Sequence, residues 1–120
     1  MFAKHICEQY KTALPGIQMK TLCFGGRTLM TEFILDRGST LPVHSHPYEQ
    51  TGYLVKGRVR LKIGSEEHEA GPGDSWCIAP DMEHGAQIVE DSIAVEVFSP
   101  VREDYLPAAS PPSRVTRSSA

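Results

Sequence analysis

The stretch GSTLPVHSHPYEQTGYLVKG, residues 38–57, says most about how this chain folds. Its residues favour extended backbone, and side chains two apart on a strand point to the same face of a sheet. His44 and His46 therefore share a face, and Gln50 has the same parity. The stretch predicts strand structure that presents two imidazoles and one amide to the same side.

A second segment, GPGDSWCIAPDMEH at residues 71–84, supplies another histidine behind a strong turn signal. Three imidazoles and one side-chain amide oxygen suit a borderline divalent metal ion. The predicted ligands are His44, His46, Gln50 and His84, which hold one ion and leave at least one coordination position open to water. These donor types accept Zn, Ni, Fe, Mn or Cu, so they leave the identity of the metal open.

The two segments together read G-x5-H-x-H-x3-(E/Q)-x6-G followed by P-G-D-x5-P-x3-H. This pattern resembles the two motifs of the cupin superfamily in residue type, spacing and order, and the resemblance covers residues 17–106. It implies an all-β, single-domain cupin jelly-roll β-barrel, also called a double-stranded β-helix. The sequence departs from the pattern at Gln50, where a ligand carboxylate is usual, and in lacking the asparagine that often follows the second motif.

Each polar residue of these segments also has a structural interpretation. His5 and His68 fit the predicted site in neither spacing nor context, and we expect both at the surface. Glu49 has the opposite parity from the ligands, so it is expected on the exterior. For Gln50 the alternative to a ligand is a buried amide that bonds to a neighbouring strand or holds a water molecule.

Length and composition fit one compact domain. A chain of 120 residues with 40% hydrophobic content can bury a single core, and a net charge of −3 offers no basic surface for nucleic acid. The N-terminal residues lack a signal peptide's apolar region, and no stretch is long enough to span a membrane. Three scattered cysteines argue against a disulfide framework and favour a reducing cytoplasm. We expect an N-terminal arm over residues 1–16, the barrel over 17–106 and a disordered tail over 107–120.

Short strands separated by turn signals are expected almost throughout the barrel. Gly25 and Gly26 are expected to form a hairpin turn, and Lys56 and Gly57 a second turn. A short turn of helix is expected within Ile6–Ala13. The predicted strands are Ile17–Phe24, Arg27–Leu35, Leu41–Ser45, Gln50–Val55, Val59–Ile63, Glu66–Ala70, Ser75–Ile78, Ala86–Val89 and Ser92–Ser99.

The last of these strands opens the segment SIAVEVFSPVREDY, residues 92–105, in which Glu96 and Phe98 share one face. The segment resembles the small cupins of pectin and alginate breakdown. Those proteins open 4,5-unsaturated uronate rings to linear 4-deoxy-5-keto-uronates, and the resemblance implies such an activity here. Glu96 stands where that group of cupins typically has aspartate.

The predicted catalytic residue is Glu96, a carboxyl group that moves protons beside the metal. Its alternative is a structural salt bridge to Arg102. Tyr48 and Phe98 are candidates to stack on a sugar face or simply to pack in the core. Arg102 is a candidate to bind a substrate carboxylate through two hydrogen bonds, or to attach the end of the last strand to the barrel.

Neutral ligands leave the full charge of a metal ion in the cavity, which favours a small anionic substrate. The first hypothesis is therefore a metal-dependent isomerase- or lyase-like enzyme acting on sugar acids. The second is an Fe- or Mn-dependent oxygenase, ranked lower because Gln50 replaces the carboxylate of a facial triad. The third is a non-enzymatic module that binds a small ligand. A homodimer is expected, with Ile17–Phe24 and the arm Met1–Pro15 as candidates for exchange between subunits.

Overall fold

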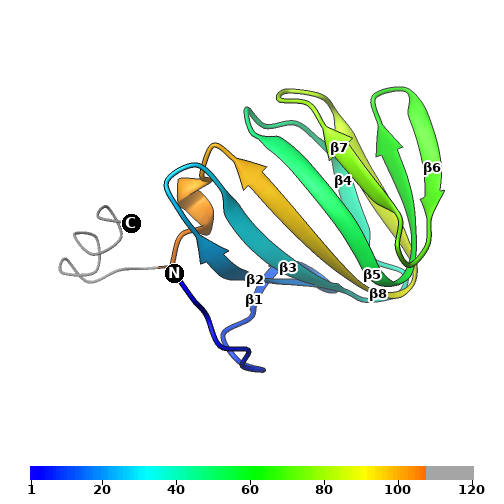
Figure 1. Ribbon diagram of the computed structural model, residues 1–120. Coiled ribbons are helices and arrows are strands. Elements are labelled where there is room, and N and C mark those ends of the chain that lie inside the picture. The colour runs from blue at the N-terminus through cyan, green and yellow to red at the C-terminus, as the bar shows by residue number, and fades with distance from the viewer. Residues whose placement is uncertain (108–120) are drawn as a thin grey trace.

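The computed structural model describes residues 1–107 and is built almost entirely of strands (Figure 1). The one described helical element is the short 3-10 turn η1 (Glu103–Tyr105), and no described helix is long and apolar enough to cross a membrane. The tail was predicted for residues 107–120, and all of it except Pro107 lies outside the described residues. The strands are β1 (Lys11–Leu14), β2 (Ile17–Phe24), β3 (Leu29–Leu35), β4 (Thr40–His44), β5 (Glu49–Ile63), β6 (Glu66–Ala70), β7 (Ser75–Ile78) and β8 (His84–Ser99).

Two long strands, β5 and β8, pair antiparallel along most of their lengths and connect everything else. The second half of β8 pairs with β3, and its beginning pairs with β4. The first part of β5 pairs with β7, and its later part pairs with β6. The order β1-β2-β3-β8-β5-β7 therefore forms one layer, and β4-β8-β5-β6 forms the other, because both long strands continue from layer to layer.

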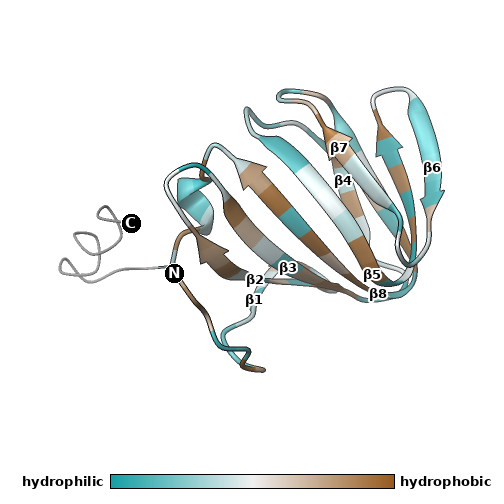
Figure 2. Cartoon of the chain, viewed as in Figure 1, coloured by the Kyte–Doolittle hydropathy of each residue, from teal (hydrophilic) through white to brown (hydrophobic). Residues whose placement is uncertain are grey.

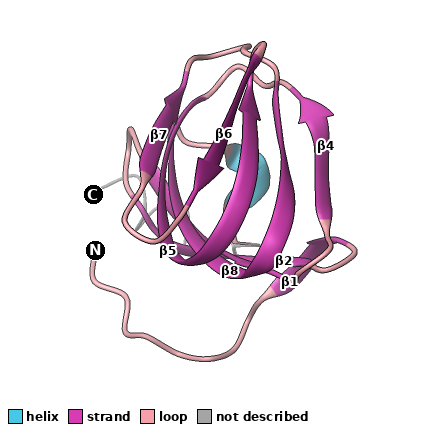
Figure 3. Cartoon of the chain, turned by 90° about the vertical axis from the view of Figure 1, so that its right-hand side faces the viewer, coloured by secondary structure: helices cyan, strands magenta, loops and turns pink. Residues whose placement is uncertain are grey.

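The two layers curve toward each other without closing into a barrel. In Figure 3 the strands β5 and β8 curve upward from the bottom of the view, with β4 on the right, β7 on the left and β6 between them. Within residues 1–107, β1 does not pair with β4, and β6 does not pair with β7. The expected closed barrel is therefore an open two-layer jelly roll, because the short edge strands end before they meet.

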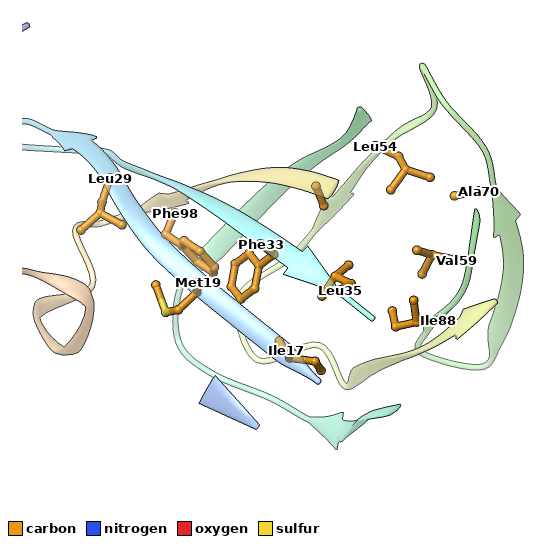
Figure 4. Packing of buried hydrophobic residues seen from close by; sticks show 11 residues of the cluster. Ile17, Met19, Leu29, Phe33, Leu35, Leu54, Val59, Ala70, Ile88 and Phe98 are labelled. Carbon is orange, nitrogen blue, oxygen red and sulfur yellow. The ribbon is translucent and has the colours of Figure 1, made fainter. Parts of the chain in front are cut away.

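The core lies between the layers and follows the alternation of each strand. Along β3 the buried residues are Leu29, Thr31, Phe33 and Leu35, and the side chains between them are more exposed. Figure 2 shows the same alternation as brown and teal bands along the strands. Burial of each large apolar side chain contributes about 1.5–3 kcal/mol. Figure 4 shows this cluster, whose largest fully buried members are Phe98, Ile17, Met19, Leu29 and Leu54.

Several predicted boundaries differ from the structure. The expected turn at Lys56 and Gly57 is an irregularity inside one continuous strand, β5, and the two predicted strands of residues 86–99 are one strand, β8. The residues of Ile6–Ala13 form no helix, and those from Lys11 onward belong to β1. A glycine and a break in alternation mark a sharp bend as well as they mark a turn, which explains why the long strands were divided.

Gly57 makes the bend that carries β5 from one layer to the other. Its φ of 101° lies in the left-handed region, and the pairing of β5 with β8 shifts register on both sides of it. A Cβ atom at this position would lie 2.5 Å from the carbonyl oxygen of Asp91 and 2.6 Å from the Cα of Ser92. The nearest atom of all is Oγ of Ser92, at 2.1 Å, but rotation of that side chain would leave the clash with the two backbone atoms in place. The two-layer architecture depends on a glycine here.

We predict that Gly57→Ala lowers the free energy of unfolding by at least about 2 kcal/mol, because it combines an unfavourable φ with a backbone clash. Gly25→Ala is the matched control, since a Cβ atom at Gly25 would meet no other atom within 4 Å. Urea denaturation of both variants measures the difference. Equal stability of the two variants would contradict the role assigned to Gly57.

Candidate metal centre

Three histidines converge at one end of the space between the layers. His44 is the last residue of β4 and His84 the first of β8, and the two are cross-strand partners. His46 lies in the loop between β4 and β5. One ligand atom from each of these histidines lies within 4.8 Å of the others. The strand pairing of β4 with β8 thus brings together histidines that are forty residues apart in the sequence.

The ring orientations of His44 and His84 are fixed by backbone carbonyl groups. Nδ1 of His44 lies 2.8 Å from the carbonyl oxygen of Pro42, and Nδ1 of His84 lies 2.8 Å from that of Met82. A carbonyl oxygen only accepts, so Nδ1 carries the proton in both rings and Nε2 carries a lone pair. This is the arrangement that metal-binding histidines usually show, in which the second nitrogen is held by an acceptor.

Nε2 of His84 is buried and has no hydrogen-bond partner among the described residues. A buried polar atom without a partner is costly, and an ion in contact with its lone pair would remove that cost. Burial lowers the pKa of His84 and of His46, and the neighbouring charges of His44 and Arg102 lower each further. Both imidazoles are therefore held in the neutral form that a metal requires.

Gln50 completes the donor set from the start of β5. Its side chain is buried, and its Oε1 lies 2.9 Å from Nε2 of His46, where the ring nitrogen donates. In this tautomer the lone pair of the His46 ring is on Nδ1, which is buried and has no hydrogen-bond partner among the described residues, so Nε2 would have to lose its proton to become a ligand. Two ligands about 2.1 Å from one ion at right angles would be about 3 Å apart, so the spacing of Nε2 and Oε1 would then suit adjacent ligands. The four residues predicted as ligands thus fit a borderline divalent ion in donor type and placement. Glu49 is exposed, as its parity predicted.

The three histidines differ in their exposure to solvent. His44 is exposed, His46 is partly buried and His84 is buried. His44 and Arg102 line both the interior cavity and a surface groove between β1 and β4. A small molecule can therefore approach the histidines through this groove. The remainder of the interior cavity is walled mainly by apolar side chains.

Glu96 points into the same cavity from β8, as its parity with Phe98 predicted. Its Oε1 accepts a hydrogen bond of 3.0 Å from the indole Nε1 of Trp76. Burial raises the pKa of the Glu96 carboxyl, while hydrogen bonds from Gln50 and Trp76 and the charge of Arg102 oppose that rise. A carboxyl group with a raised pKa keeps its proton to a higher pH than an ordinary glutamate does.

Arg102 forms its ion pair with Asp104, and no described ion pair joins it to Glu96. Nε and Nη2 of Arg102 donate to the two carboxylate oxygens of Asp104, at 3.2 and 2.8 Å. The guanidinium also packs on the rings of Tyr105, Phe98 and Tyr48, with centroids at 3.9, 5.0 and 5.1 Å. Its Nη1 atom has no described protein partner and remains available to an anion.

The two aromatic candidates lie in different surroundings. Phe98 is fully buried, forms part of the cavity wall and meets the ring of His46 edge-on at a centroid distance of 5.8 Å. Tyr48 packs against His46 and Arg102 and is not among the described residues that line the interior cavity. Phe98 therefore contacts the cavity directly, and Tyr48 supports two residues that do.

Two residues of the site were not singled out from the sequence. Tyr105 covers Arg102 from η1 and lines the cavity, and Trp76 bonds to Glu96 from β7. Trp76 has the same parity as the buried Ile78, and that alternation could have indicated an inward side chain. Tyr105 lies beyond the last strand, so alternation gives no signal for it, but it is the final residue of the segment that resembles the small cupins of pectin and alginate breakdown.

We predict that replacing His44 and His46 together by Ala abolishes retention of Zn²⁺, while the strands remain folded, because neither ring belongs to the apolar core, which His46 meets at Phe98. Metal analysis after dialysis measures the first effect, and circular dichroism the second. The double variant His5→Ala, His68→Ala is the matched control, since both residues are exposed and outside the cluster. Full zinc occupancy in the first double variant would disprove the site.

Comparison with known proteins agrees with this geometry. Residues 31–100, more than half of the chain, match the cupin domain family. The pectin degradation protein KdgF of Dickeya dadantii is 26% identical over 93 residues, which span 76% of this chain and 84% of that protein.

Solved structures agree as well. KdgF from a Halomonas species superposes with a TM-score of 0.83 at 30% identity, covering 88% of this chain and 98% of that chain. An RmlC-like cupin from Shewanella frigidimarina gives a TM-score of 0.83 at 26% identity, covering 88% and 95%. The family match, the jelly-roll layers and the histidine cluster together show that this chain belongs to the cupin family.

Proposed function

We propose that this cupin is a metal-dependent enzyme that converts a 4,5-unsaturated uronate into its linear 4-deoxy-5-keto isomer. The observation that carries the proposal is a buried carboxyl group, Glu96, in the same cavity as three convergent histidines. The names of two relatives, a pectin degradation protein and a second KdgF, support a sugar acid as the substrate class.

The charge of the site favours an anion. A divalent ion held by His44, His46, Gln50 and His84 would act as a Lewis acid toward a substrate oxygen, with no ligand carboxylate to offset its charge. Arg102 adds a second positive charge at the border of the cavity and the entrance groove. Its Nη1 atom, which has no hydrogen-bond partner among the described residues, can donate to the carboxylate of a uronate that enters by this route.

Linearisation of such a sugar requires one proton to move within the substrate. The hydroxyl at C1 loses a proton, the bond between C1 and the ring oxygen breaks, and an aldehyde and an enolate result. C4 then takes up a proton, so the 5-keto product is an isomer of the substrate and no other reactant is needed. We assign the transfer of this proton to Glu96, whose raised pKa suits a group that both accepts and donates. Phe98 forms an apolar wall beside it.

We predict that Glu96→Gln lowers turnover of an unsaturated uronate by about 10²-fold or more, because the amide cannot carry the proton. The Michaelis constant should change much less, since binding is assigned to the metal centre and Arg102. Loss of absorbance at the substrate C=C band measures the rate, with Glu49→Gln as control because Glu49 is exposed.

A second measurement on the same variant separates a proton carrier from a structural residue. Because burial raises the pKa of Glu96 above its ordinary 4.5, ionisation of Glu96 opposes folding, and its contribution to stability falls as pH rises through that raised pKa. In metal-free protein, Glu96→Gln should therefore be the more stable form at neutral pH, and the difference should shrink toward about pH 4.

Near-normal turnover with a clear loss of stability would return Glu96 to a structural role. Oxygen consumption with another substrate, together with no reaction on any unsaturated uronate, would instead favour an oxygenase. Tight binding of a uronate without turnover would favour a binding module.

We also propose a homodimer. Strand β1 is an edge strand, and the arm before it exposes 73% of Met1, 87% of Phe2 and 40% of Ile6. Apolar side chains on an arm beside an open edge are typical of segments that pack on a second subunit. Light scattering at micromolar concentration should give twice the mass of one chain, and removal of residues 1–9 should give the monomer. A monomeric mass for the full chain would contradict the proposal.

The compartment proposed for this protein is a reducing one such as the cytoplasm. Cys7, Cys23 and Cys77 are all free thiols in the structure. Two of them, Cys7 and Cys77, are exposed, and exposed thiols persist where the surroundings keep them reduced.

A further inference from the structure

Three residues form a row across the inner face of the layer that carries Glu96. Gly52 of β5 is the cross-strand partner of Glu96 on β8, and it is also the partner of Trp76 on β7. Glu96 and Trp76 therefore lie two strands apart, on either side of a glycine. Strands in a sheet are spaced by about 4.8 Å, so the side chains must bridge nearly 10 Å between backbones to meet.

The missing side chain at Gly52 is what lets them meet. A Cβ atom at this position would lie 2.2 Å from Cε2 and 2.2 Å from Nε1 of Trp76, so the indole lies flat over the glycine. From there its N–H reaches Oε1 of Glu96 at 3.0 Å. A glycine inside a strand often marks such a close approach, and here the approaching group is the indole ring.

We infer that Trp76 is a positioning residue, which lies across Gly52 and holds the carboxyl group of Glu96 in one orientation inside the cavity. The catalytic importance of this role rests on the function proposed above. Glutamate has one more rotatable bond than aspartate, and a proton carrier must lie within hydrogen-bond reach of a defined atom. A fixed N–H donor restricts that extra freedom.

Trp76 also separates two spaces. It lines the interior cavity on one side and, on the other, an open groove between β6 and β7 that Leu61 and Asp74 also line. Trp76 therefore lies between the cavity and this groove, at an edge where β6 and β7 do not pair. Replacement of Trp76 by Phe keeps an aromatic ring at this position and removes the N–H together with the rest of the five-membered ring. The comparison of Trp76→Phe in the wild-type and Glu96→Gln backgrounds therefore separates positioning from closure.

The geometry can be tested without any substrate, because Trp76 is the only tryptophan of the chain. A ¹⁵N–¹H spectrum then contains a single indole N–H resonance. We expect it to exchange slowly with solvent, to shift in Glu96→Gln, and to exchange at least about tenfold faster in Gly52→Ala, where the added methyl displaces the ring.

Gly25→Ala is the matched control and should leave this resonance unchanged, since nothing lies within 4 Å of its added Cβ. An indole resonance that does not respond to Glu96→Gln would overturn the inference. If Gly52→Ala does not fold, the indole resonances of the wild type and of Glu96→Gln still decide whether Trp76 bonds to Glu96.

The kinetic test uses Trp76→Phe and a double-mutant cycle. Turnover of an unsaturated uronate should fall about tenfold, the size expected for one lost hydrogen bond, with unchanged zinc content and Michaelis constant. In a Glu96→Gln background, Trp76→Phe should cause no further loss, because it acts only through the carboxyl group. Tyr53→Phe is the control, since Tyr53 faces outward and is half exposed.

Full turnover in Trp76→Phe, or equal losses in both backgrounds, would refute the positioning role. Failure of the proposed function gives a different result. In that case the wild-type protein has no activity on uronates, while the indole resonance still depends on Glu96.

Discussion

The antiparallel pairing of β5 with β8 is the interaction on which the rest of the molecule depends. It is the longest contact between strands, and every other strand except β1 and β2 is hydrogen-bonded to one of these two. Because both strands continue through the bend near Gly57, one pairing positions both layers at once. The same pairing places Gln50 beside Phe98 and His84 beside Ile63, so it also fixes the relative positions of the ligands.

The interior is divided between a packed part and a polar part, and the division explains how a small domain tolerates buried charge. Leu54, Val59 and Ile88 belong to the apolar core, and the last two also line the cavity that the ligands share. At the other end Gln50, His84 and Glu96 are buried as well. Burial of these polar groups costs free energy, which the hydrogen bonds among them and their backbone partners offset only in part. Such local cost is common where a protein performs chemistry.

The sequence predicted a large part of this arrangement, because the side chains of a strand point alternately to its two faces and the sequence shows that alternation. Alternation placed Glu96 and Phe98 inside and Glu49 outside, and the two motifs named four side chains that do converge in space. Alternation could not distinguish a bend from a turn at Gly57, since a glycine with positive φ serves in either. It also could not place Trp76 beside Glu96, because that contact depends on which strands become neighbours. The open edges of the jelly roll are likewise a property of strand lengths and pairing.

The amide of Gln50 has a consequence for which sequences this site can accept. It lies between His46 and Glu96, with its oxygen toward the ring and a hydrogen bond to the carboxyl group. A glutamate at position 50 would place a second carboxyl group beside that of Glu96 in a buried site. Two neighbouring carboxyl groups cannot easily both be ionised there, so one of them would keep its proton. Residues 50 and 96 are therefore not independent. An ancestor or descendant of this chain that gains a ligand carboxylate at position 50 should lose the acid at position 96, and its chemistry would change with it.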